Sequence, residues 1–168
     1  LTGSFSFMGL AQTTSTSQIS GATTVAATTT PVMNAVSNVG GIWFDNVAST
    51  ASLASLTLDV NGTLRAQDAI GSLGHVGIAL GRMAITGSCN IYFDSNTQYN
   101  KFLNATEFKY ALEVADGNGK CYIFTLPRVK YTSGTVTAGG LDQDVVFAGN
   151  FEAIKDATYG IMVQIDRF

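Results

Sequence analysis

The chain has 168 residues, of which 46% are hydrophobic and only 12% are charged. That charged share is about half of the ~25% usual in globular proteins, so much of the surface must be neutral Ser, Thr, Asn and Gly. With little charge repulsion to keep copies apart, this composition favours a self-associating subunit over a merely uncharged monomer. The net charge of −3 argues against tight nucleic-acid binding, which needs clustered Lys and Arg. No stretch approaches the ~20 apolar residues of a membrane span, so no membrane contact is expected.

The first expected elements are a strand and a long polar segment. Two phenylalanines alternate with serines at the start of Ser4–Leu10, which predicts a half-buried strand there. From Gln12 to Thr30, eleven of the nineteen residues are Ser or Thr and no period is sustained. Such a segment cannot bury enough apolar area to offset its ordering entropy. We expect a long loop or arm at about 12–41, either disordered or ordered by a neighbouring subunit.

Alternation of apolar and polar residues resumes at 56–60, which predicts a strand that ends at the turn signal Asn61-Gly62. An irregular stretch follows. Apolar residues then occupy the even-numbered positions over 76–80 and the odd-numbered positions over 83–93, so the apolar face of the strand changes side. This change of phase at Gly81-Arg82 indicates a β-bulge or a sharp bend.

One short helix is predicted next. Asp94-Ser95 can cap its start, and Tyr99, Phe102 and Leu103 lie at i, i+3 and i+4, which gives one apolar stripe. The helix is expected to end near Asn104.

The remaining chain predicts strands separated by turns. A strand over 108–114 has one polar face, and Asp116–Gly119 favours a hairpin turn over a calcium loop, because the terminal Glu of such a loop is missing. Residues 121–126 are apolar on both faces, which indicates a central strand or one that faces a partner. Pro127 cannot donate to a ladder and predicts an edge or a break. Residues 133–140 are small and polar, and we expect a flexible loop there.

Two further strands, within 145–153 and 160–168, complete the predicted set. Seven or eight strands, one short flanking α-helix and two long loops predict a single mainly β domain over 1–168, an antiparallel β-sandwich or barrel.

Residues that could carry chemistry are scarce. His75, the one histidine, begins an apolar strand and is interpreted as structural. No nucleophile elbow, phosphate-binding loop or paired-histidine metal motif occurs. Asp142 and Asp144 would lie on the same face of an extended segment and could hold a cation or act as an acid/base pair. No other candidate ligand or catalytic residue is near them in the sequence, so we interpret both as solvated surface charges. We therefore expect no enzyme, no metal and no cofactor, with Cys89 and Cys121 as buried free thiols.

Four stretches of the C-terminal half follow one another in the order Tyr122–Lys130, Gly139–Val145, Phe151–Ala153 and Ile165–Arg167. In their order and spacing they resemble the motifs of the tail tube proteins of long-tailed bacteriophages. Gly87–Asp94 with the helix at Tyr99–Leu103, and the opening stretch Gly3–Gly9, are similar to the same family.

This resemblance implies a β-sandwich with a flanking helix, assembled into rings whose inner sheets join as a continuous barrel. Stacked rings would form the tail tube through which DNA passes. The partners implied are other copies of the chain, other phage tail proteins and viral DNA as passing cargo, in a virion made in the host bacterial cytoplasm. Related proteins can carry two such halves, so the chain, which begins at Leu1, is either one subunit or the second half of a longer one.

A sandwich has exposed edges, and a tube subunit would use them for pairing. The arm and the small polar loop are expected to make the contacts between rings or subunits. The alternative is a monomeric binding module, such as a carbohydrate-binding or adhesin-like sandwich, which would need an exposed aromatic platform or a cation site; a hydrolase on a β-scaffold is a more distant third. The predicted contact residues are Thr13, Thr14, Thr16, Thr23, Thr24, Ser133, Gly134, Thr135, Thr137, Gly139 and Gly140.

Overall fold

The computed structural model describes residues 3–10, 13–29, 33–34, 36–49, 52–116 and 118–168. The chain divides into an extended unit, residues 1–32 and 62–82, and a sandwich unit, residues 33–61 and 83–168. The described residues form ten strands and one helix: β1 (Val39–Phe44), β2 (Val47–Ala48), β3 (Leu53–Asn61), β4 (Arg65–Gln67), β5 (Gly77–Ala79), β6 (Ala84–Tyr92), α1 (Thr97–Leu103), β7 (Phe108–Ala115), β8 (Cys121–Ala138), β9 (Val145–Ala153) and β10 (Gln164–Arg167). None of the helical segments among them is long and apolar enough to cross a membrane.

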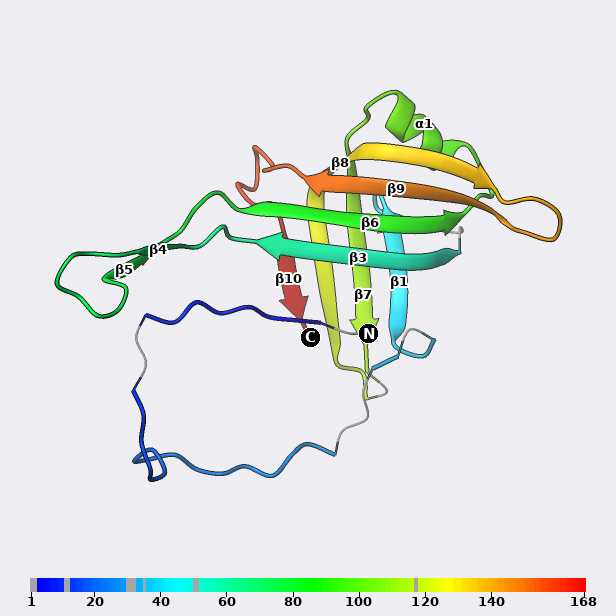
Figure 1. The fold of residues 1–168 in the computed structure, drawn as a ribbon. Helices are drawn as coiled ribbons and strands as arrows, with labels where there is room; N and C mark the ends of the chain where they lie inside the picture. The colour runs from blue at the N-terminus through cyan, green and yellow to red at the C-terminus, as the bar shows by residue number, and fades with distance from the viewer. Residues whose placement is uncertain (1–2, 11–12, 30–32, 35, 50–51, 117) are drawn as a thin grey trace. The chain divides into compact units, whose positions relative to one another are not determined.

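The sandwich unit is one antiparallel sheet folded into two layers. Its strand order is β2-β1-β7-β8-β9-β6-β3, and β10 also pairs with β8. The first half of β8 pairs with β7 and β10, and its second half pairs with β9. Figure 1 shows β1 and β7 running across the direction of β9, β6 and β3, which is how the layers of an orthogonal sandwich are arranged. The predicted fold class is confirmed.

Strand β8 turns from the first layer into the second close to Pro127. Between Leu126 and Val129, two residues of β8 oppose one residue of β7, which is a β-bulge. Proline fits there because a bulge leaves one residue unpaired, so the missing amide removes no ladder hydrogen bond. A second register shift, against β9, follows between Tyr131 and Ser133. The prediction of an edge or break at Pro127 is therefore wrong, since one 18-residue strand passes through it.

Aromatic rings fill the space between the two layers. Phe147 and Phe151 of β9 are 1% and 4% exposed, and they alternate with exposed residues as predicted. The ring centroids of Phe108 and Tyr131 lie 4.8 Å apart, and those of Tyr131 and Phe147 lie 5.4 Å apart. Such pairs stabilise a core by about 0.5–1.5 kcal/mol each beyond their buried area, so the core depends on ring geometry as well as on burial.

Helix α1 lies beside β8 and covers one end of this core (Figure 1). Tyr99 and Phe102 pack against the buried cluster, but Leu103, predicted to share their stripe, is 59% exposed. The helix ends at the predicted Asn104. Its N-cap is Asn96, without a side-chain capping bond, so the predicted cap at Asp94-Ser95 is wrong.

The extended unit differs most from the sequence predictions. Residues 3–10 form no strand, because no bridge pairs them with any other described residue, and the strand predicted over Ser4–Leu10 is wrong. Residues 13–29 contain no helix or strand, as predicted for an arm, and residues 12, 30–32 and 35 of the predicted arm lie outside the described residues. The predicted end of the arm at about 41 is wrong, because β1 begins at Val39. The stretch after Asn61 contains a short hairpin of β4 and β5. Strand β5 lies within the apolar strand indicated at 76–80, whereas the sequence did not indicate β4. The phase change at Gly81-Arg82 falls between β5 and β6, so it separates two strands and is not a bulge within one.

Candidate assembly surfaces

The second layer of the sandwich, made of the last part of β8 with β9, β6 and β3, ends in two free edges. Within the described part of the chain, β3 pairs only with β6 along nine residues. At the opposite side, the pairing with β7 stops at Val129, and residues 130–138 of β8 pair with β9 alone, with helix α1 packed beside this part of the strand. Unpaired edges of this length are templates for another strand.

The direction of the backbone groups along β3 follows from its pairing with β6. Ser88 lies directly opposite Thr57, and its amide points at β3, where it donates to Thr57 Oγ1 at 3.0 Å. Amide directions alternate along an antiparallel strand, so the amides of Leu58 and Val60 point away from β6. Val60 is also 51% exposed. The free edge of β3 therefore presents hydrogen-bond donors next to an accessible apolar side chain.

Hydroxyl and amide side chains cover the outward face of this second layer. Strand pairing places Thr57, Ser88, Asn150 and Ser133 in one row across four strands. Thr57 Oγ1 and Ser88 Oγ are 2.7 Å apart, and Asn150 Nδ2 donates to Ser133 Oγ at 2.8 Å. These side chains satisfy one another, so they offer few free donors to a passing ligand.

The charges on this face form the neighbouring row. Asp59 of β3 and Glu152 of β9 are exposed, and Lys130 of β8 lies half-buried beside Glu152. Two carboxylates against one ammonium leave the face weakly acidic. Such a surface lacks the clustered positive charge that binds nucleic acid.

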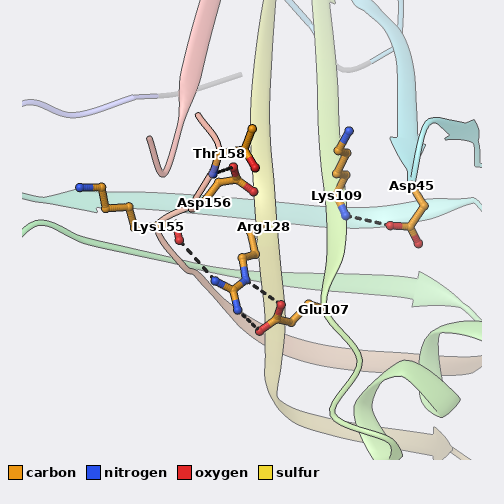
Figure 2. A network of polar contacts seen from close by, with 7 residues as sticks. All are labelled: Asp45, Glu107, Lys109, Arg128, Lys155, Asp156 and Thr158. Carbon is orange, nitrogen blue, oxygen red and sulfur yellow. Dashed lines mark hydrogen bonds and ion pairs between the residues drawn. The ribbon is translucent and has the colours of Figure 1, made fainter. Parts of the chain in front are cut away.

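The bend of β8 is braced by a polar network on its outer side (Figure 2). Arg128 donates to both carboxylate oxygens of Glu107, at 2.6 and 2.8 Å, and more weakly to the carbonyl oxygen of Lys155 at 3.5 Å. The hydrogen bond from Arg128 lowers the pKa of Glu107 below its usual value of 4.5. This two-pronged contact fixes the residue directly after Pro127. It is solvent-exposed, so its role is to orient the bend and not to supply most of the stability.

Two aspartates in the same view order the neighbouring turns. Asp45 lies in the two-residue turn between β1 and β2, accepts the amide of Lys109 at 2.9 Å and pairs with Lys101 of α1 at 2.6 Å. Burial acts to raise the pKa of Asp45, but the hydrogen bonds from Lys101 and Lys109 lower it overall. Asp156 accepts the amides of Thr158 and Tyr159, both at 2.8 Å, and so caps the turn that leads toward β10.

The structure separates the predicted contact residues into two groups. The five threonines of the arm lie exposed in the extended unit. The second group was predicted as a flexible loop over 133–140, and this is wrong for 133–138, which continue β8 and pair with β9. Gly134 is even packed against the ring of Phe102, since an added Cβ would lie 2.8 Å from it. Only Gly139 and Gly140 lie beyond the strand, and Gly140 uses a φ of 122° that favours glycine.

The other singled-out residues remain scattered. His75 Nδ1 lies 2.5 Å from Asp68 Oδ1 in the loop between β4 and β5. Cys89 is buried and Cys121 half-buried, both are free thiols, and burial raises the pKa of Cys89. Asp142 and Asp144 are exposed in the turn region before β9. Across the described ranges, no three His, Cys, Asp or Glu side chains gather as metal ligands would.

Within the described residues, the chain is a charge-poor antiparallel sandwich with sheet edges that lack a strand partner and a polar outer face. The chain belongs to the phage tail tube protein family, whose family model matches residues 1–160. It is thus a structural protein of the phage tail, a class that is not enzymatic, and membership implies assembly with other copies and with other tail proteins in the virion.

One solved structure similar to this chain is the cap that terminates the tube of the anti-feeding prophage, determined by cryo-EM. The similarity has a TM-score of 0.52 and 11% sequence identity, and it covers 86% of this chain and 97% of that one. At this identity the likeness concerns the fold. No curated protein matches the chain.

Proposed function

We propose that copies of this chain close into rings, that the rings stack into the tail tube, and that viral DNA passes through it. The observation that carries the proposal is the second layer of the sandwich. Its two edges without a strand partner among the described residues, on β3 and on residues 130–138 of β8, belong to the same four-stranded layer. A sheet that is open at both sides can join copies head to tail into a closed barrel.

Strand direction supports this way of joining. All pairings among β8, β9, β6 and β3 are antiparallel, so β3 and the end of β8 run in opposite directions. When β3 of one copy meets β8 of the next, the seam is antiparallel like every other pairing in the layer. The joined barrel has no free edge left to aggregate.

The outward face of that layer would then line the channel. Its rows of Ser, Thr and Asn are bonded to one another, and the Ser55 to Asn90 contact of 2.8 Å adds to those described above. Its charged row carries Asp59 and Glu152 against one lysine, Lys130. A wall without surplus cations forms few phosphate contacts, so DNA would move along it without being retained.

The arm threonines and the turn at Gly139-Gly140 remain our proposed contacts between rings or subunits. They are exposed, uncharged and outside the core of the sandwich. Deleting residues 13–24 is expected to stop tube growth and to leave the sandwich folded. If negative-stain microscopy shows tubes of normal length from this deletion, the arm does not make the contact that tube growth needs.

Ring closure is tested by a proline at the free edge. Val60→Pro removes an amide that points away from β6, so the sandwich should keep its own hydrogen bonds and lose the donor for the next copy. Ala157→Pro is the matched control, because it follows the turn-capping Asp156, where proline is tolerated. We expect rings or tubes with a central hole from the parent and the control, and no closed rings or tubes from Val60→Pro. Rings from Val60→Pro would contradict the proposed seam.

DNA passage is tested by reversing the charge of the proposed wall. In phage particles that carry Asp59→Lys with Glu152→Lys, ejection should slow, because two lysines per copy would hold phosphates in the channel. The control reverses Glu113 and Asp166, which lie in one row on the opposite, first layer of the sandwich. Equal ejection rates for the two double variants would show that DNA does not pass along this face.

A further inference from the structure

The segment Gly3–Leu10 has the sequence of a half-buried strand but no strand to pair with among the described residues. Phe5 and Phe7 are 86% and 90% exposed. Removing a phenylalanine side chain from water is favourable, and two phenylalanines spaced by one serine suit one face of a strand. The pattern therefore indicates a strand whose partner lies outside the described residues of the single chain.

Strand β10, which is four residues long, offers an edge to four of the eight residues of this segment. Phe168 and Cys121 exchange two backbone hydrogen bonds, at 3.0 and 3.2 Å. Because bonding alternates along an antiparallel pair, the backbone groups of Ile165 and Arg167 point away from β8. The described part of the chain gives β10 no other partner, so these groups form a free edge in the first layer of the sandwich.

The side chains along this edge complement those of the segment. Ile165 is 57% exposed and lies beside Phe124, on the same side of the sheet as the core residue Leu126. Gln164 and Asp166 point to the opposite, polar face. An added strand with two phenylalanines on one side and serines on the other would match both faces of this edge. A shift of its register by one residue would instead place the phenylalanines on the polar face and the serines on the apolar face.

We propose that Gly3–Leu10 of one copy adds as a strand to β10 of a second copy. Phe5 and Phe7 then cover Ile165, and Ser4 and Ser6 lie beside Gln164 and Asp166. The partner is a second copy because, in the single chain, both phenylalanines remain exposed. This inference rests on the self-association proposed above, but it uses a different sheet edge, so the two can fail independently.

The first test measures binding of a labelled peptide with the sequence of residues 3–10. The acceptor is the full chain carrying Phe5→Ser and Phe7→Ser, so that its own segment does not compete. Fluorescence anisotropy should show binding, and adding Ile165→Pro to the acceptor should weaken it by about tenfold or more. Ile165→Lys tests the same edge without a proline. Val60→Pro is the control and should leave binding unchanged.

A second test separates docking onto another copy from docking within one chain. It uses the Val60→Pro background, in which β3 no longer closes rings. One variant adds Phe5→Ser and Phe7→Ser and keeps a working β10 edge; the other adds Ile165→Pro and keeps a working segment. By sedimentation velocity each alone should be a monomer, and their mixture should form a one-to-one pair.

Three results would overturn the proposal. The first is a mixture that stays monomeric, because docking would then occur within one chain or not at all. The second is peptide binding that is lost with Val60→Pro and kept with Ile165→Pro, which would assign the segment to β3. The third is equal binding of a peptide in which both phenylalanines are replaced by serine. Ring formation by the Ile165→Pro chain would support the proposed seam between β3 and β8. The contact between Gly3–Leu10 and β10 is decided separately, by the peptide assay.

Discussion

The segment Gly3–Leu10 and strand β9 have the same kind of pattern and different fates. In β9, Phe147 and Phe151 alternate with exposed residues and are 1% and 4% exposed. In Gly3–Leu10, Phe5 and Phe7 alternate with serines and are 86% and 90% exposed. The difference is that β9 has β6 and β8 on its two sides. A period of two specifies what a strand would bury, but pairing specifies whether the strand forms.

The largest expected difference between β9 and Gly3–Leu10 is in how much a phenylalanine contributes to the free energy of unfolding. Phe147→Ala removes a side chain that meets the rings of Tyr99 and Tyr131, and it should lower the free energy of unfolding by about 3–5 kcal/mol. Phe7→Ala should change it by less than about 0.5 kcal/mol. Urea denaturation of both variants measures the contrast. Equal losses would mean that Phe7 belongs to the folded core.

A smaller contrast is expected at two glycines. A Cβ at Gly87 would collide with the ring of Phe151 and the carbonyl oxygen of Thr57, whereas a Cβ at Gly3 would meet nothing within 4 Å. Gly87→Ala should destabilise the sandwich by about 1–3 kcal/mol through overpacking, and Gly3→Ala should be close to neutral. Thermal unfolding followed by circular dichroism compares the two. An unaffected Gly87→Ala would show that β3 can move away from β6.

The smallest expected effect concerns pH. Because Arg128 lowers the pKa of Glu107, this carboxylate stabilises the fold at pH values above its usual 4.5, and the contribution is lost as the pH falls through the lowered value. Glu107→Gln should be less stable than the parent at neutral pH and converge with it in acid. Asp68→Asn, in the extended unit, should leave the unfolding of the sandwich unchanged throughout. Parallel pH curves for parent and Glu107→Gln would contradict this role of the Arg128 contact.

The parts of the fold that follow from local pattern were predictable. The strand over 108–114 and the helix around Tyr99 each combine a clear period with a turn or an end signal, and each is present. Strands β7 and β8 pair antiparallel on either side of the predicted hairpin turn, in which Gly117 lies outside the described residues. The central position of 121–126 also follows from its two apolar faces, because β8 has neighbours on both sides.

The errors concern features that depend on distant residues. Pro127 looked like a strand end because the bulge that accommodates it is formed with β7. Residues 133–138 looked like a loop because their small side chains suit flexibility, yet Gly134 leaves room for Phe102, which comes from another element. The family motifs marked the stretch around Arg128, but its partner Glu107 could be identified only once the chain had folded.

The second layer contains an even number of strands per copy, and this has a consequence for ring symmetry. With three or five strands, each seam would bring two parallel edges together, and the hydrogen-bond pattern would change at every subunit boundary. With four alternating strands, every seam repeats the antiparallel pattern whatever the number of copies. Strand polarity therefore does not select the ring size. The number of subunits in the proposed ring would then follow from the angle between the second layers of neighbouring copies, which the side chains at the seam would set.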